Sequence, residues 1–214
     1  MSKLSKRHFW EWFKRHHKEY LELNNRPAKE ARYWLQELDA HLRAYFKFLG
    51  FTLAVPHEGT PTLTITVYGK AKYFKKADAF VATAPEIPGW SIRALDDPKP
   101  IDFFLEKQME DTGIDPREFF FSFATNDLRE RDIIVYHPLC VSDNQYHLLQ
   151  LASAAIYNLL GERSFGTDIG TLEVANLSLA DTDEIYQLEE LPAHMSMRSS
   201  SLFIDGHGTL QGIH

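Results

Sequence analysis

Two stretches of this sequence end a predicted strand on the dipeptide Val-Tyr and then lead into a segment with helical spacing. They are Thr64–Tyr68 and Asp132–Tyr136. Around the first, Leu63, Ile65 and Val67 alternate with threonines, which is the period of two expected of a half-buried strand. A strand-to-helix junction that occurs twice predicts one ββαββ unit laid down twice, although chance is a competing interpretation because Val-Tyr is common.

The first predicted unit covers residues 51–106 and the second covers residues 117–179. The first has predicted strands at Phe51–Val55, 62–68, Trp90–Leu95 and Ile101–Leu105, and a helix within 71–84. The second has predicted strands at Phe119–Phe123, Arg131–His137, Phe165–Ile169 and Thr171–Leu179, and a helix that opens at a Ser142–Gln145 capping box and ends at Gly161. Strand pairs dominate and the helices are separate from them, so the predicted fold class is α+β with mainly antiparallel sheets.

Residues 1–50 predict a helical hairpin that precedes this α+β domain of residues 51–179. Aromatic residues recur at helical spacing over residues 6–24, and Pro27 suits the first turn of the next helix. That helix is predicted to reach Leu49 along one apolar seam, formed by Ala31, Leu35, Leu38, Leu42, Tyr45 and Leu49. Gly50 then stands where a left-handed C-cap belongs.

Composition excludes several classes of protein. The 214 residues are 44% apolar, enough for a sizeable core, and the single cysteine rules out an internal disulfide. No stretch approaches 18 apolar residues, so no membrane span is expected, and the first residues lack a signal-peptide pattern. A cytoplasmic location is therefore the expectation.

The charge is distributed unevenly along the chain. Residues 1–35 contain nine Lys/Arg and four Asp/Glu, whereas the remainder contains 14 and 26, and the net charge is −7. An acidic chain is not expected to be a general nucleic-acid binder. Opposite charges at the two ends favour association with another protein or with a second copy. The predicted surfaces are a basic one (Trp12, Lys14, Arg15, Lys18) and an acidic one (Asp181, Asp183, Glu184, Glu189, Glu190).

The acidic surface belongs to a tail of residues 180–214 that differs from the rest of the chain. Acidic residues without basic neighbours are followed by three serines, Ser199 to Ser201. Two interpretations stay open: a mobile extension, or an arm that adds a strand to its own sheet or to that of a partner.

The best cluster of reactive side chains is His137, Cys140, Asp143 and His147. Imidazole, thiolate and carboxylate are zinc ligands, and a His-x2-Cys spacing lets both side chains reach one ion. A metal-dependent hydrolytic enzyme is therefore one alternative, and a Cys140 nucleophile with a histidine base is another. The competing interpretation is structural: a strand-end histidine, a small buried cysteine and a helix-capping aspartate. No other cofactor motif is present.

A further alternative is nucleic-acid association through the first helix. Lys14, Arg15 and Lys18 lie among Trp10, Trp12 and Phe13, the residue types that contact phosphates and stack on bases. The aromatic residues share the apolar side of the helix, however, so a core role explains them equally well.

Three motifs resemble those of a set of uncharacterised bacterial α+β proteins. They are Trp10–Phe13 (W-x-W-F), Ala84–Trp90 (A-P-x-L-P-x-W, with Ile87 where leucine is usual) and Ile169–Glu173 (I-G-x-x-E). The resemblance covers about residues 8–177 and implies the fold without assigning an activity. The leading prediction is thus a non-catalytic protein that acts by protein–protein or self association, with no cofactor.

Overall fold

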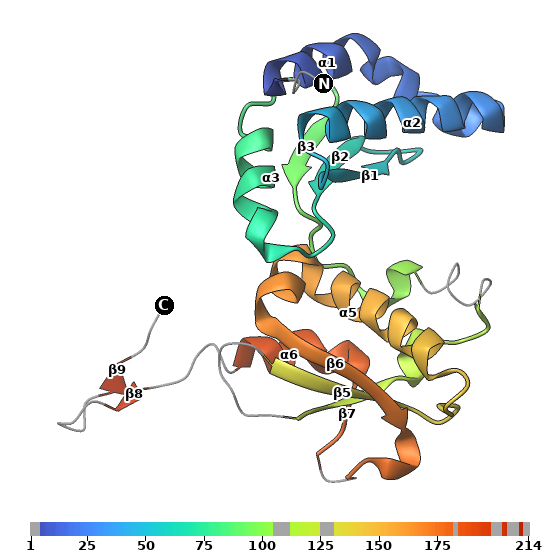
Figure 1. The fold of residues 1–214 in the computed structure, drawn as a ribbon, viewed down its shortest axis with the longest axis vertical. Helices are drawn as coiled ribbons and strands as arrows, with labels where there is room; N and C mark the ends of the chain where they lie inside the picture. The colour runs from blue at the N-terminus through green and yellow to red at the C-terminus, as the bar shows by residue number, and fades with distance from the viewer. Residues whose placement is uncertain are drawn as a thin grey trace. The chain divides into compact units, whose positions relative to one another are not determined.

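The structure is a computed structural model that describes residues 5–104, 112–124, 131–181, 184–197, 203–204 and 210–211. The chain divides into two compact units, Met1–Asp96 (unit 1) and Asp97–His214 (unit 2). Each unit has its own buried apolar cluster. The predicted α+β class, with mainly antiparallel sheets and a pair of N-terminal helices, is confirmed (Figure 1).

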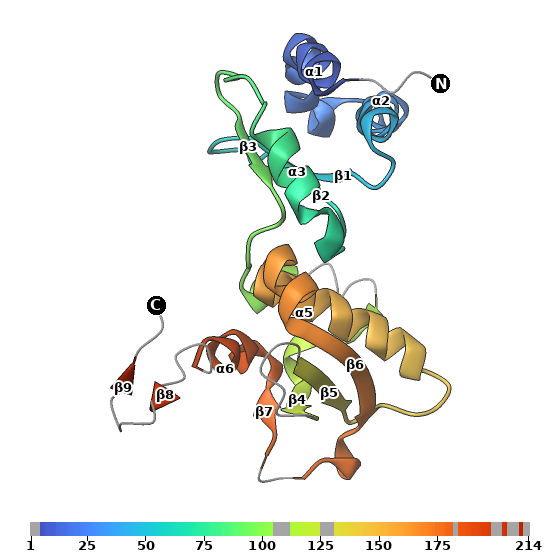
Figure 2. The same cartoon turned by 60° about the vertical axis from the view of Figure 1, so that its left-hand side comes forward.

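Unit 1 begins with the two helices and continues into a three-stranded sheet. Its elements are α1 (Lys6–Leu21), α2 (Ala28–Tyr45), β1 (Gly50–Ala54), β2 (Thr62–Thr66), α3 (Phe74–Val81) and β3 (Ser91–Ala94). Helices α1 and α2 lie side by side in both views (Figure 2). The side chain of Ser5 caps α1 by accepting a hydrogen bond from the backbone N–H of His8.

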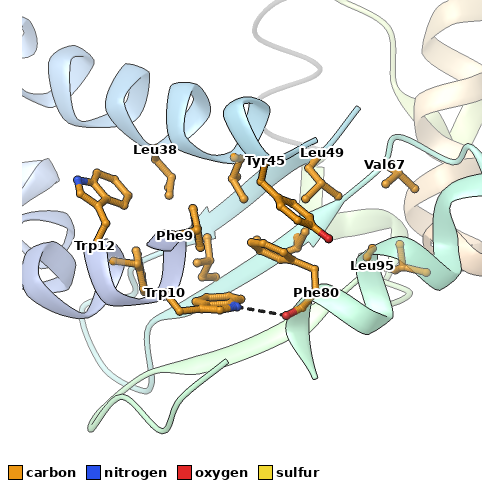
Figure 3. Close-up of a cluster of buried hydrophobic side chains, with 14 of the residues drawn as sticks. Phe9, Trp10, Trp12, Leu38, Tyr45, Leu49, Val67, Phe80 and Leu95 are labelled. Atoms are coloured by element: carbon orange, nitrogen blue, oxygen red, sulfur yellow. Dashed lines mark hydrogen bonds between the residues drawn. The ribbon is translucent and has the colours of Figure 1, made fainter. Parts of the chain in front are cut away.

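The sheet of unit 1 has the order β1-β2-β3. Strands β1 and β2 are antiparallel with Phe51 opposite Ile65, and β2 and β3 are parallel with Leu63 opposite Ile92. The core is dense in aromatic rings from α1, α2 and α3, and the indole Nε1 of Trp10 donates a hydrogen bond to the Phe80 carbonyl at 3.2 Å (Figure 3). The aromatic side chains of α1 are therefore core residues.

Gly50 is not the predicted helix cap. Helix α2 ends at Tyr45, and Gly50 is a buried residue of β1. A Cβ at this position would lie 2.1 Å from the Tyr68 hydroxyl oxygen, so the glycine permits a close approach between strand and ring. The predicted seam is also wrong at Leu35, which is exposed, because the helix turns that residue away from the core.

Unit 2 contains a four-stranded sheet and a long helix. Its main elements are β4 (Phe120–Phe123), β5 (Arg131–His137), α5 (Gln145–Asp168), β6 (Ile169–Asn176), β7 (Tyr186–Gln187) and α6 (Leu191–Met197), with short strands β8 (Phe203–Ile204) and β9 (Leu210–Gln211) paired to each other. The sheet order is β6-β5-β4-β7. Strand β5 is antiparallel to β4 and parallel to β6.

The two units share one connectivity. In each, an antiparallel hairpin is followed by a helix and by a strand parallel to the second strand of the hairpin: β1-β2-α3-β3 and β4-β5-α5-β6. The repeated order is ββαβ, one strand shorter than predicted. Strands β2 and β5 are the two that the Val-Tyr pattern identified as equivalent. Each is the second strand of its hairpin and has a neighbouring strand on both sides.

Three local predictions in unit 2 are wrong. Residues Ile101–Phe104 form a 3-10 helix rather than a strand. The cap of α5 is Asn144 rather than Ser142. Residues 165–168 are helical rather than part of a strand: Gly161 (φ 72°) ends the first helical stretch of α5, as predicted, and a second stretch then continues to Asp168. The helical stretch after Gly161 is too short for its apolar period to be told from that of a strand.

The tail contributes to the fold of unit 2. Tyr186 pairs with Phe121, so β7 adds a strand to the chain's own sheet, which is one of the two alternatives left open. Leu188 and Leu191 are fully buried in the core of unit 2. Within the described residues, no helix combines the length and the apolar character needed to cross a membrane.

Candidate interaction surfaces

His137, the last residue of β5, is fully buried. Its Nδ1 accepts a hydrogen bond from the backbone N–H of Leu139 at 3.2 Å, and its Nε2 lies 3.5 Å from the Glu118 carboxylate. Cys140 is also buried, whereas Asp143 and His147 are exposed. The four predicted ligands thus divide into two interior and two surface side chains.

The electrostatics of Cys140 do not favour metal binding or nucleophilic attack. Burial lowers the pKa of His137, an effect that Glu118 opposes, and burial raises the pKa of the Cys140 thiol. The thiol therefore stays protonated at neutral pH, and the thiolate is the form that binds metals or attacks carbon. Among the residues described, which include all four predicted ligands, no three His, Cys, Asp or Glu side chains are grouped to hold a metal ion.

Burial of His137 predicts acid sensitivity. Since its folded-state pKa is below the unfolded value of about 6.5, the unfolded chain binds more protons as the pH falls below that value. We expect the free energy of unfolding to be unaffected above about pH 7 and to fall below pH 6.5, by at most about 1.4 kcal/mol per pH unit. Urea unfolding of His137→Gln at several pH values should show a shallower fall than the parent, and His147→Gln, on an exposed site, is the control.

The loop from Pro138 to Asn144 is held by two asparagine side chains. The Asn144 side chain accepts from the Val141 N–H at 2.9 Å and donates to the Leu139 carbonyl at 2.8 Å. Asn176, at the end of β6, donates to the carbonyls of Pro138 (3.1 Å) and Cys140 (2.8 Å). These bonds satisfy the loop backbone internally and fix its conformation.

Apolar side chains in this loop and in the segments beside it are exposed to solvent. Leu139 and Val141 are 59% and 58% exposed, Tyr146 in the first turn of α5 is 73% exposed, and Leu179 after β6 is 75% exposed. Because β5 and β6 are parallel and His137 lies opposite Asn176, the segments that follow them start at the same end of the sheet. We call Leu139, Val141, Tyr146 and Leu179 the edge patch.

The surroundings of the edge patch are acidic. Asp143 lies in the same loop and is exposed, and Asp181 follows Leu179 and is exposed. Unit 2 as a whole contains seven Lys/Arg and 20 Asp/Glu. The patch is therefore an apolar surface with negative charge around it.

The predicted basic surface is only partly as expected. Lys14, Arg15 and Lys18 are exposed on α1. Trp12 is buried and its ring stacks on His41, with centroids 3.9 Å apart and planes within 11°. Trp12 is therefore a core residue and not a contact residue. Trp10 and Phe13 are buried as well, so none of the three aromatic residues of the prediction offers an exposed ring on which a base could stack.

The predicted acidic surface is mostly exposed. Asp181, Glu184, Glu189 and Glu190 are at the surface, and Asp183 lies outside the described residues. Glu190 also has a local role, because its carboxylate accepts a hydrogen bond from the Gln187 N–H at 3.3 Å and lies 3.8 Å from the His194 ring.

The sequence contained a signal for the edge patch that reasoning about reactive groups missed. Leu139 and Val141 alternate with Cys140 in a loop flanked by Pro138 and Asn144, a spacing that places apolar side chains on either side of the predicted ligand. Comparison with known proteins finds no protein-family model, no curated protein and no solved structure that matches this chain.

Proposed function

We propose that this protein acts by binding another protein through the edge patch of unit 2. The observation that carries the proposal is the exposure of four large apolar side chains around a loop whose backbone is fixed by Asn144 and Asn176. Contiguous apolar side chains on a surface are typical of interaction sites.

Two physical features support this role. A loop that is already ordered loses little conformational entropy on binding, so more of the free energy of apolar contact remains as affinity. Tyrosine is enriched at protein interfaces because its ring supplies apolar area and its hydroxyl supplies a hydrogen bond, and Tyr146 is the aromatic member of the patch.

The negative charge around the patch favours a partner with a basic contact face. Two copies of unit 2 that met through this patch would bring like net charges together, which opposes association. The partner that fits is a different protein whose contact face is apolar at its centre and carries Lys or Arg at its margin. Leu139, Val141 and Leu179 would contact the apolar centre of the partner's face, and Asp143 would attract the Lys or Arg side chains at its margin.

A selection from a random peptide library displayed on phage tests this proposal. We expect enriched peptides to contain two or more large apolar residues next to Lys or Arg, and to bind the purified protein in solution. Leu139→Ser/Leu179→Ser should weaken that binding at least about tenfold, since each buried leucine contributes about 1.5–3 kcal/mol. The measurement is fluorescence anisotropy of the labelled peptide.

The matched control is Tyr33→Ser/Leu35→Ser, which removes two exposed apolar side chains from α2. It should leave peptide affinity unchanged. Failure to enrich any peptide, or equal loss of affinity in both variants, would contradict the proposal. Sedimentation velocity of the unliganded protein provides a second check, because self-association abolished by the Leu139/Leu179 variant would identify a second copy as the occupant and overturn the charge argument.

A further inference from the structure

Unit 1 has the opposite charge balance from unit 2, and part of its positive charge gathers around a group of aromatic rings. It contains 16 Lys/Arg and ten Asp/Glu. Five lysines come from the segment after α2, the turn after β2, the 3-10 helix Ala71–Tyr73 and α3: Lys47, Lys70, Lys72, Lys75 and Lys76. We call them the lysine face.

Four aromatic rings bring four of these lysines together. The rings of Phe48 and Tyr73 stack with centroids 4.7 Å apart, and the Phe46 ring meets Tyr73 edge-on at 5.2 Å. The Nζ atoms of Lys47 and Lys70 lie 4.8 Å and 5.5 Å from the centre of the Phe48 ring.

The other contacts repeat this arrangement. Lys72 lies 5.1 Å from the centre of the Tyr73 ring, and Lys76 lies 5.3 Å and 5.4 Å from the centres of Tyr45 and Phe46. Cation–π contacts of this kind hold an ammonium group in place without neutralising it. Lys75 directly precedes Lys76 in α3 and is exposed.

The lysine face carries its charge without carboxylate partners. Within the described part of the chain, none of its five lysines forms an ion pair. By contrast, Arg7, Arg26 and Arg43 of the same unit are each paired with a carboxylate. Clustered like charges repel one another, and a bound anion would relieve that repulsion.

We propose that the lysine face binds the phosphate backbone of nucleic acid without base selectivity. Lysine is a point charge that suits phosphate oxygens and, unlike arginine, imposes no bidentate geometry. The rings are occupied by one another and by ammonium groups, so they offer no free face for base stacking. Contacts with the backbone position a nucleic acid but do not read its sequence.

The density of charge favours nucleic acid over an acidic polypeptide. Duplex DNA carries about one negative charge per 1.7 Å of axis, whereas an extended chain of acidic residues carries at most one per roughly 3.3 Å. Several ammonium groups held around neighbouring rings favour the denser polymer. Because the net charge of the whole chain is −7, binding is expected to be weak and strongly dependent on salt.

The test is fluorescence anisotropy of the full-length protein with a labelled 20-base-pair DNA duplex of mixed sequence, at several salt concentrations. Lys70→Gln/Lys72→Gln/Lys75→Gln should weaken binding about tenfold or more at low salt. It should also reduce the slope of log K against log salt by about one for each phosphate that the variant no longer neutralises. These side chains are exposed, so circular dichroism should show an intact fold.

The matched control is Lys14→Gln/Arg15→Gln/Lys18→Gln, which removes the same charge from the exposed side of α1. Unchanged DNA affinity in this control supports the lysine face as the binding site. An equal loss of affinity in the two triple variants would overturn the proposal, because it would show that only the net charge of the protein matters. Displacement of the duplex by polyglutamate at equal charge concentration would also overturn it, in favour of an acidic protein ligand. Leu139→Ser/Leu179→Ser keeps the charge and should bind DNA normally, so the two proposals fail separately.

Discussion

Replacing Phe80 with alanine is expected to lower the free energy of unfolding of unit 1 by about 3–5 kcal/mol. Phe80 is fully buried in α3 and contacts the rings of Phe9, Trp10 and Tyr45, with centroids 5.1, 4.9 and 4.9 Å apart (Figure 3). Truncation therefore removes apolar burial and also leaves a cavity beside rings from α1 and α2, which cannot all move inward.

Tryptophan fluorescence isolates this effect, because all four tryptophans of the chain lie in unit 1. The urea midpoint by fluorescence should fall sharply in Phe80→Ala. Tyr33→Ala, which removes an exposed ring from α2, is the control. It should shift the midpoint by an amount that corresponds to less than about 0.5 kcal/mol in the free energy of unfolding. A Phe80→Ala midpoint within that range would show that this core is not packed as described.

Ending the chain after Ala180 is expected to prevent unit 2 from folding. The truncation removes Leu188 and Leu191, which are fully buried, and Met195, which is also buried in the same core. Each such side chain contributes about 2–5 kcal/mol, and together they approach the whole stability of a domain, about 5–15 kcal/mol. It also removes the carbonyls of His194 and Met195, which accept hydrogen bonds from the buried guanidinium of Arg131 at 3.1 and 3.4 Å.

The truncated chain should lose part of its far-ultraviolet circular dichroism and keep the tryptophan fluorescence of native unit 1. A finer variant, Leu188→Ala/Leu191→Ala, should lower the stability of unit 2 without touching the chain length. Glu189→Ala, at the exposed residue beside Leu188, is its control and should be near neutral. Full retention of the dichroism after truncation would mean that the tail is not part of the core.

Where the sequence pattern is strong, it predicts local structure well. Strand β5 has the bounds that the pattern predicts, because Ile133 and Val135 alternate with residues on the other face over a run of β-branched residues. The equivalence of β2 and β5 is visible in the sequence for the same reason. Residues 165–168 are misassigned from sequence because a few residues after a helix-interrupting glycine contain less than two turns of periodic signal.

The candidate surfaces are harder to predict, because exposure depends on what packs nearby. The sequence places Trp12 and Lys14 on one surface, but the ring of Trp12 meets His41 of α2 and is buried. The spacing of His137 and Cys140 predicts ligands, yet the end of β5 places both inside. Lys47 and Lys70 of the lysine face are 23 positions apart in the sequence, and the ammonium groups of both lie near the Phe48 ring.

The sequence by itself determined the fold class, the helical pair, the strand equivalence and the opposite charges along the chain. Those features follow from local periodicity and composition, which any short window of residues expresses. Only the tertiary structure decided which side chains stay at the surface: it buried the aromatic residues of α1, exposed Leu139 and Leu179, and gathered lysines around shared rings. Burial is a property of contacts between distant segments, and so the functional surfaces appeared only when those segments were brought together.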